Sequence, residues 1–392
     1  MSSEYYISPP PPPTKLGRYR VLSPNASVYV SPLQLGGASI GDKWSNIGMG
    51  KMDKDASIKL LDAYYDAGGN FIDTSCNYQD GTSEEFIGEW MEKRGIRDEM
   101  VIATKYSSFF KRGDPSVSIK VNYVGNGHKS LHLSVEGSLK RLRTTYIDIL
   151  YVHWWTWDSS IEEVMSSLHN LVVARKGISD TPAWIVVKAN QWAKFHGKTP
   201  FCVYQGRWNI LDRSFERDII PMAKAEGLAL APFGVLAEGR IRTDEEERRR
   251  KETGENGRSI AVSSNLVAWE RNEDERKVCK KLEEIANELG AKNITSIAIA
   301  YVMHKAPYVF PIIGGRKVEH LQSNVEALDI KLTPEHIKSL ESLFPFEPGF
   351  PHNVIIMQGD GSAVRKAFLN VATLDKWEGI PALPTPANNK VI

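Results

Sequence analysis

Short apolar runs alternate with amphipathic segments of helical periodicity along most of the chain, starting near Leu33. This alternation is typical of parallel strand–helix units, and eight such units can be counted over about 300 residues. The pattern therefore predicts an α/β fold, a (β/α)8 or TIM barrel. The expected strands are Leu33–Gly36, Phe71–Thr74, Met100–Lys105, Ile147–His153, a fifth strand shortly before Thr181, Phe201–Gln205, Leu228–Phe233 and Val309–Ile313.

Segments outside the eight units predict a few additions to this barrel. Apolar positions at helical spacing within Glu270–Leu289 predict an extra amphipathic helix on its surface. The mixed charge run Asp244–Arg258 is interpreted as a solvated loop or helix start. The expected helices of the units are Ala56–Ala67, Ser83–Arg94, Leu131–Thr144, Ser160–Leu171, one starting at Thr181-Pro182, Phe215–Glu226, Ile294–His304 and Val318–Leu328.

The sequence patterns at the two ends of the chain differ from the strand–helix alternation of the middle. Residues 1–15 contain five consecutive prolines and predict an extended, poorly ordered tail. Arg18–Leu22 and Ser27–Val30 flank Ser-Pro-Asn-Ala, which predicts a hairpin that caps one end of the domain. We expect a single barrel domain over residues 16–345 and a C-terminal extension over residues 346–392.

Composition narrows the class of protein. The formal charge of +1 gives no electrostatic argument for binding nucleic acid or an anionic membrane. The three cysteines, Cys76, Cys202 and Cys279, lack the spacing of a zinc site, and no other metal-ligand cluster is visible. No run of about eighteen apolar residues is present. We therefore expect a cytoplasmic protein without nucleic acid, membrane or metal, and a monomer or weak homo-oligomer.

Four ionisable residues follow or end predicted strands. Asp73 ends the strand of Phe71 and Ile72, Tyr78 lies five residues later, and Lys105 and His153 end the two strands after that. Each alone has an ordinary structural interpretation, such as a strand-end cap or a surface amine. Because active sites of (β/α)8 barrels lie at the carboxyl ends of their strands, the four together favour catalysis.

These residue types suit the reduction of a carbonyl group. Reduction by a hydride donor needs a proton for the developing alkoxide, and tyrosine, with a pKa near 10, releases one only if its pKa is lowered. The Lys105 ammonium is predicted to lower the pKa of Tyr78, and Asp73 to hold that ammonium in place. His153 could orient the substrate oxygen or share the proton. Tyr78 would then be the acid in reduction and, as phenolate, the base in oxidation.

At these residues the chain resembles the aldo-keto reductases, whose tetrad is Asp, Tyr, Lys and His. Within that family it is most similar to the fungal aryl-alcohol dehydrogenases and the related norsolorinic acid reductases. The resemblance covers about Leu33 to Leu340. It rests on Phe71-Ile72-Asp73-Thr74 with Tyr78, Thr104-Lys105, Asp148–Trp155, Gln205–Asn209 and Gly314–His320.

The resemblance implies an extended NADP(H) across the barrel mouth, and no Gly-x-Gly-x-x-Gly supports a Rossmann site instead. By resemblance, Ser179, Asp180 and Gln205 would hold the carboxamide, and Phe233 would stack on the nicotinamide ring. Independently, Gly314-Gly315 leads from a strand into a helix, where backbone amides can meet a phosphate, and Arg316 and Lys317 add cations suited to a 2′-phosphate. The other implied cofactor residues are Gly37, Gly234, Leu236, Gly315, Arg316, His320 and Asn324.

Tryptophans near the predicted strand ends suggest a flat substrate. Trp154 and Trp155 follow His153, and Trp44 lies on the loop after the first strand. We predict that Trp44 and Trp154 line a pocket for an aromatic carbonyl compound or alcohol. The loop Ser107–Lys129 is a candidate lid.

The fifth strand departs from the family's pattern. About four apolar residues between Lys176 and Gly177 are missing relative to the family, and a barrel that loses a strand exposes two edges. Our hypothesis is that Leu171–Ala174 leaves the fourth helix to rebuild the strand. If it does not, Ser179 and Asp180 would be misplaced. A catalytically weak or inactive cofactor-binding barrel, as in the potassium-channel beta subunits, is then the alternative, and a barrel isomerase or lyase is a third reading without support from metal ligands.

Overall fold

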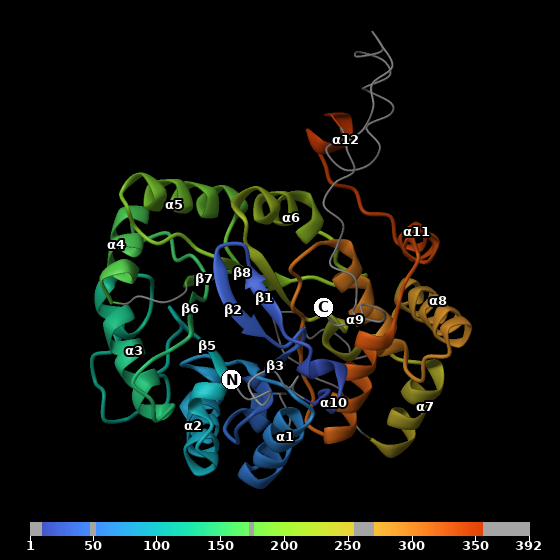
Figure 1. Cartoon of the computed structure of the whole chain (residues 1–392), viewed down its shortest axis with the longest axis horizontal. Coiled ribbons are helices and arrows are strands. Elements are labelled where there is room, and N and C mark those ends of the chain that lie inside the picture. The colour runs from blue at the N-terminus through green and yellow to red at the C-terminus, as the bar shows by residue number, and fades with distance from the viewer. Residues whose placement is uncertain (1–9, 48–51, 172–175, 255–269, 356–392) are drawn as a thin grey trace, which may run out of the picture.

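The computed structural model describes residues 10–47, 52–171, 176–254 and 270–355, and contains the predicted barrel (Figure 1). Eight strands form one sheet in the order β10-β3-β4-β5-β6-β7-β8-β9, and all neighbours in it are parallel. The predicted strands were therefore correct in number and order. Their bounds are β3 Gln34–Gly36, β4 Phe71–Asp73, β5 Val101–Tyr106, β6 Ile149–Val152, β7 Lys176–Ser179, β8 Val203–Arg207, β9 Ala229–Phe233 and β10 Ile312–Ile313.

The barrel closes between β9 and the segment that leads into β10. Leu230 forms a parallel bridge with Val309. The Leu230 amide donates to the Tyr308 carbonyl at 2.9 Å, and the Phe310 amide donates to the Leu230 carbonyl at 2.8 Å. Closure matters because it leaves no unpaired edge strand and fixes where each strand end lies.

Helices surround the barrel, and two additional helices are inserted between β9 and α9 (Figure 1). The inserted α7 (Asp244–Thr253) and α8 (Glu273–Leu289) include the predicted extra amphipathic helix. No helix in the described ranges is long and apolar enough to span a bilayer. The remaining helices are α1 Lys54–Asp66, α2 Thr82–Arg94, α3 His128–Arg141, α4 Ile161–Leu171, α5 Ala183–Phe195, α6 Phe215–Glu226, α9 Ile294–Lys305, α10 Val318–Val325, α11 Pro334–Leu343 and α12 His352–Ile355.

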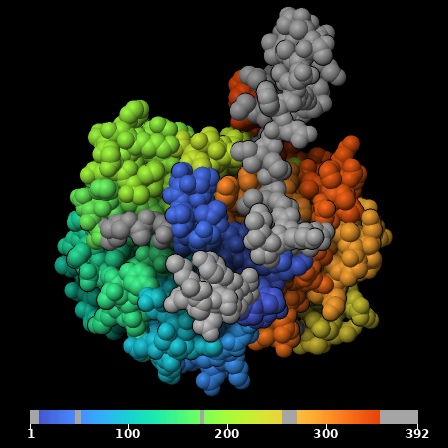
Figure 2. All heavy atoms as spheres, viewed as in Figure 1, coloured from blue at the N-terminus to red at the C-terminus, as the bar shows by residue number. Residues whose placement is uncertain are grey.

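The predicted hairpin plugs the amino-terminal end of the barrel. Its strands, β1 (Arg20–Ser23) and β2 (Ala26–Val30), are antiparallel, and Leu22 and Val30 are fully buried. These side chains share one apolar cluster with residues at the starts of the barrel strands, such as Phe71 and Ile149. Figure 2 shows the hairpin, in blue, in the middle of this face. Because this end is filled, a site must lie at the carboxyl ends of the strands.

The hypothesis that Leu171–Ala174 leaves the fourth helix is contradicted at Leu171 and stays a prediction for residues 172–174. Leu171 is still helical, as the last residue of α4, and residues 172–175 lie outside the described ranges. The four residues of β7 are sufficient to form the strand, because they pair with β6 on one side and β8 on the other. The Cys202 amide also donates to the Lys176 carbonyl at 2.9 Å. The described part of the fifth strand is therefore paired on both sides within the barrel.

The lack of a side chain at Gly177 in β7 leaves room for the Tyr151 ring of the neighbouring strand. A Cβ atom at Gly177 would lie 2.3 Å from the Tyr151 ring, which is fully buried. We expect Gly177→Ala to lower the free energy of unfolding by about 1–3 kcal/mol, since an overpacked ring must shift. Chemical denaturation would measure this, with Gly197→Ala, which nothing crowds but whose φ is +62°, as a comparison for backbone strain alone. An equal loss in both variants would contradict the packing argument.

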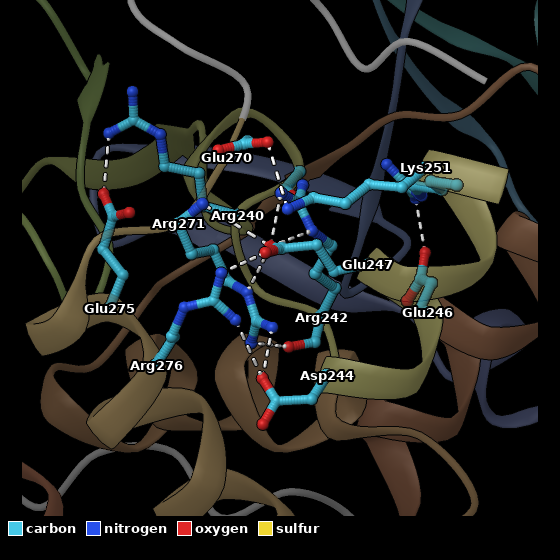
Figure 3. Close-up of polar contacts among 12 residues, drawn as sticks. Arg240, Arg242, Asp244, Glu246, Glu247, Lys251, Glu270, Arg271, Glu275 and Arg276 are labelled. Atoms are coloured by element: carbon cyan, nitrogen blue, oxygen red, sulfur yellow. Dashed lines mark hydrogen bonds and ion pairs between the residues drawn. The ribbon is translucent and has the colours of Figure 1, made fainter. Parts of the chain in front are cut away.

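The charged run after β9 was predicted to be solvated, and this was wrong for its central residue. The Glu247 side chain in α7 is only 3% exposed, and it forms ion pairs with Arg242 (2.8 Å), Arg271 (2.8 Å) and Arg276 (Figure 3). Burial raises the pKa of Glu247, but hydrogen bonds from the three arginines outweigh it and lower the pKa to about 2. The run is therefore an ion-pair cluster that joins α7 to the start of α8, and residues 255–269 between them lie outside the described ranges.

Candidate active site

The four predicted catalytic residues meet at the carboxyl end of the barrel. Asp73 is the last residue of β4, Lys105 lies near the end of β5, and His153 directly follows β6. Tyr78 begins a short 3-10 turn, Tyr78–Gly81, that leads from β4 into α2. Since β4, β5 and β6 are adjacent and parallel, their register places the four side chains on one rim.

Lys105 and Asp73 form a buried ion pair. The Lys105 Nζ atom lies 2.7 Å from each Asp73 carboxylate oxygen and 2.6 Å from the Thr74 carbonyl oxygen, and its side chain is fully buried. Burial alone would lower the pKa of Lys105, but the charges of Asp73 and Tyr78 reverse this and raise it. The amine is therefore a fixed cation at neutral pH.

Tyr78 lies against this cation. The Lys105 Nζ atom is 4.8 Å from the centre of the Tyr78 ring. Burial is the largest influence on Tyr78 and raises its pKa, the Lys105 charge opposes it, and the net direction is upward. The predicted net lowering of the Tyr78 pKa was therefore wrong, because the loss of water around the phenol outweighs the attraction of the amine. Tyr78 is consequently protonated at neutral pH.

His153 is held neutral and in a defined orientation. Burial, followed by the nearby Lys105 charge, lowers the pKa of His153 well below its usual value. Its Nδ1 atom lies 2.6 Å from the Ser108 Oγ and 3.3 Å from the Ser75 Oγ. The Ser75 hydroxyl donates to Asn77 instead, so the shorter contact favours a Ser108 hydroxyl that donates to Nδ1. That arrangement leaves the imidazole proton on Nε2.

Aromatic rings line this rim in a continuous series. Trp44 contacts Tyr78 edge-on with 6.1 Å between ring centres, and Tyr78 contacts His153 edge-on at 5.9 Å. Trp154 stacks on His153 at 4.6 Å, and 39% of its surface is exposed. Both predicted pocket tryptophans therefore lie next to a catalytic candidate. Within the predicted lid, the Phe110 and Tyr123 rings contact each other edge-on with 5.7 Å between their centres.

The residues expected to hold the carboxamide lie at the ends of β7 and β8. The Ser179 hydroxyl donates to Asp180 at 3.2 Å, and Gln205 donates to Asp73 at 2.8 Å, so Gln205 also contacts the ion pair. Asp180 has a φ of +44°, a conformation that Asp and Asn tolerate better than most residues. The carboxylate keeps some exposed surface, but the strand ends around it displace water, and this loss of hydration raises the pKa of Asp180 to about 6.

Four of the other cofactor candidates lie at the ends of β9 and β3. Phe233 ends β9 and is half-buried, and Gly234 follows in a turn with a φ of +63°. The turn is closed by a hydrogen bond from the Ala237 amide to the Gly234 carbonyl at 2.8 Å, and Leu236 lies within it. Gly37 packs so tightly that an added Cβ would lie 2.9 Å from the Asp73 carbonyl oxygen. Close packing alone therefore accounts for glycine at position 37.

The candidates for the adenosine end lie after β10. Gly315 and Asn324 line one small hollow beside α1, and Arg316 and His320 are exposed on the same helix start. Burial lowers the pKa of His320, and the charges of Lys317 and of Arg250 on α7 lower it further, so Arg250 lies within electrostatic range of this region.

Arg250 provides a test of whether this region fits a phosphate. Within the described part of the chain, the buried Arg250 Nε has no hydrogen-bond partner, although one terminal nitrogen pairs with Glu246. An unpaired buried guanidinium donor within electrostatic range of His320 suits an anionic group. The residues present therefore fit the phosphorylated end of a dinucleotide.

The sequence analysis missed two residues of the candidate site, Ser108 beside His153 and Arg250 near the proposed adenosine end. Ser108 was passed over within a serine-containing loop, because only the folded chain brings it to His153. Arg250 was missed because it lies in the charged run interpreted as solvated, and no sequence signal separates it from Arg248 and Arg249. A helical periodicity in that run would have been the only available indication.

Comparison with known proteins places the chain among relatives that it matches over nearly its whole length. It is 58% identical to an aryl-alcohol dehydrogenase (NADP+) of Phanerodontia chrysosporium, covering 95% of this chain and 97% of that protein. It is 49% identical to norsolorinic acid reductase A of Aspergillus parasiticus, covering 94% and 91% of the two chains. It is also 49% identical to the aldo-keto reductase ausK of Emericella nidulans, covering 90% and 87%.

The sequence profile of the aldo/keto reductase family matches residues 32–344. This range contains every catalytic and cofactor candidate discussed above. Taken with the barrel, the Asp73, Tyr78, Lys105 and His153 cluster and the identity to these relatives, the match shows that the chain belongs to the aldo/keto reductase family and is a nicotinamide-dependent oxidoreductase.

Proposed function

We propose that this enzyme interconverts aromatic aldehydes or ketones and the corresponding alcohols with NADP(H), and that Tyr78 is the proton donor in reduction. The observation that carries the proposal is the contact series from the buried Asp73–Lys105 ion pair to the half-buried Tyr78 ring. A tyrosine on the protein surface would have no fixed cation beside its ring, and water would surround its hydroxyl group. The names of two relatives, an aryl-alcohol dehydrogenase (NADP+) and norsolorinic acid reductase A, support the same activity.

The chain's own residues hold and move one proton. When bound, the dihydronicotinamide supplies the hydride for the carbonyl carbon. Tyr78, protonated at neutral pH because burial raises its pKa, gives its hydroxyl proton to the carbonyl oxygen, and the Lys105 cation stabilises the phenolate that forms. Asp73 keeps that cation in place, and the neutral His153 can donate a hydrogen bond from Nε2 to the same oxygen.

The substrate is proposed to be aromatic because of the rings that surround this oxygen site. Trp44 and Trp154 flank Tyr78 and His153 on opposite sides of the ring series. Such an arrangement suits a flat ring, which gains from edge and face contacts in addition to its apolar area. Benzaldehyde and benzyl alcohol are the simplest probes of this class.

NADP(H) is favoured over NAD(H) by the cations near Gly315. We expect Arg250→Ala to raise the dissociation constant for NADPH about tenfold, because a charged hydrogen bond contributes roughly 1.5–3 kcal/mol, and to leave that for NADH unchanged. Fluorescence titration with each nucleotide measures both constants. Arg249→Ala, one residue away and exposed, is the matched control. An equal effect on NADPH and NADH, or an equal effect of the control, would contradict a role in binding the 2′-phosphate.

The proposal is tested by benzaldehyde-dependent oxidation of NADPH, followed by absorbance, together with benzyl-alcohol-dependent reduction of NADP+. Activity in both directions with NADPH binding supports it. Binding without turnover would favour the non-catalytic barrel instead. That alternative was motivated by damage to the fifth strand, and the pairing of β7 on both sides removes this motivation.

A further inference from the structure

We propose that Asn126 is a positioning residue for His153 and Trp154, acting as a buried clamp between the two loops that carry the reacting and substrate-facing groups. The inference rests on the proposed function, since it assigns a residue to the same site. Asn126 lies at the end of the candidate lid, two residues before α3. It contacts neither of the catalytic side chains directly, so its effect must pass through the backbone that holds them.

The Asn126 side chain is fully buried, and its amide group is used completely. Its nitrogen donates to the Ser107 hydroxyl at 2.8 Å and to the Trp154 carbonyl at 2.9 Å. Its oxygen accepts from the Thr156 amide at 2.8 Å and lies 3.0 Å from the Thr156 hydroxyl, whose proton goes to the closer Asp158 carboxylate. One amide therefore ties the loop after β5, through Ser107, to the loop after β6, through Trp154 and Thr156.

The loop after β5 needs such support at this point. Ser107 has a φ of +84°, a left-handed conformation that costs a non-glycine residue about 1–3 kcal/mol. The Gly125 amide donates to the Ser107 carbonyl at 3.0 Å, so the segment that carries Asn126 contacts Ser107 through both backbone and side chain. These bonds fix Ser107 in a conformation that it would otherwise leave.

Two residues that contact the His153 ring, Ser108 and Trp154, lie beside or at the positions that Asn126 holds. Ser108 follows Ser107 and contacts the His153 Nδ1 at 2.6 Å, while Trp154 follows His153 and stacks on its ring. Asn126 therefore holds the hydroxyl and the indole that define the tautomer and plane of the imidazole. If the clamp is removed, the strained Ser107 can relax, and Ser108 loses its alignment with Nδ1. An error of about 1 Å in such a group can reduce rate a hundredfold.

Two substitutions at Asn126 separate its functions. Asn126→Asp keeps the volume and the acceptor oxygen but loses both donated hydrogen bonds, and Asn126→Ala also loses the bond from the Thr156 amide. We expect both to lower kcat for benzaldehyde reduction about 10- to 100-fold and to raise KM severalfold, because Trp154 shifts. The dissociation constant for NADPH should stay within about twofold, because the proposed cofactor residues lie on other loops.

Asn190 on α5 provides the matched control. It is also fully buried, and its amide accepts from the Phe201 amide at 2.8 Å and donates to Glu226 at 3.3 Å, on elements away from the catalytic rim. Asn190→Ala should lower thermal stability as Asn126→Ala does but leave kcat unchanged. If kcat falls equally in both, or if Asn126→Asp retains the wild-type kcat, the proposal is overturned.

A second measurement does not depend on activity. Nitrogen-15 spectra of the imidazoles should show His153 of the wild type as one neutral tautomer with the proton on Nε2, and a mixture of tautomers in Asn126→Ala. This result would support the clamp even if the wild type failed to oxidise NADPH and the proposed function were wrong. An unchanged His153 spectrum in Asn126→Ala would overturn the clamp, whatever the wild-type activity.

Discussion

Tyr78→Phe is expected to lower kcat for benzaldehyde reduction by about a thousandfold, within the range that general acid catalysis supplies. The substitution removes one oxygen atom and leaves the ring contacts with Trp44 and His153 in place. The dissociation constant for NADPH should therefore change less than about twofold. Steady-state kinetics and fluorescence titration on the same protein would measure both quantities.

The control for this prediction is Tyr29→Phe, which removes the hydroxyl of an exposed tyrosine on the hairpin at the opposite end of the barrel. It should retain full activity. Retention of more than about a tenth of the wild-type kcat in Tyr78→Phe would show that another group supplies the proton. A large loss of NADPH affinity would show instead that Tyr78 serves binding.

Lys105→Met is expected to impair both stability and activity. The substitution leaves the Asp73 carboxylate, 4% exposed, without its cation, and breaking one side of a buried pair costs about 3–5 kcal/mol in the free energy of unfolding. It also removes the charge that stabilises the Tyr78 phenolate, so kcat should fall by about 10²-fold or more. Urea denaturation at pH 7 and steady-state kinetics measure the two effects.

The direction of the Lys105 pKa shift determines the pH at which the wild type and Lys105→Met should be compared. Because the pKa of Lys105 is raised in the folded protein, its contribution to stability is fully present below the unfolded value of about 10.4 and is lost only as the pH rises through the folded pKa. Lys93→Met, which breaks an exposed pair with Glu89 on the outside of α2, should leave stability nearly unchanged. An equally small effect of Lys105→Met would contradict the importance of the buried pair.

Much of the fold and the catalytic cluster could be predicted from local patterns. Apolar runs of four to six residues set the strands, and helix bounds such as Phe215–Glu226 were predicted exactly because Gly227 follows in a left-handed conformation. The catalytic residues were predictable because strand ends are identifiable in sequence, and parallel neighbours bring strand ends together.

The features that could not be predicted depend on contacts between distant segments. Glu247 was interpreted as solvated because its three arginine partners include Arg271 and Arg276, beyond the 255–269 segment. The direction of the Tyr78 pKa shift depends on how much water burial removes, and sequence does not give that balance. The pairing of Lys176–Ser179 with both neighbouring strands also depends on distant segments, and the sequence does not show it.

The most direct test of the central claim is a single-turnover experiment. Protein loaded with NADPH is mixed rapidly with excess benzaldehyde, and the absorbance of NADPH is followed in the wild type and in Tyr78→Phe. The account predicts that the wild type oxidises one equivalent of bound NADPH and forms one equivalent of benzyl alcohol, while the variant binds NADPH equally well and oxidises it about a thousandfold more slowly. Equal rates in the two proteins, or bound NADPH that the wild type never oxidises, would contradict it.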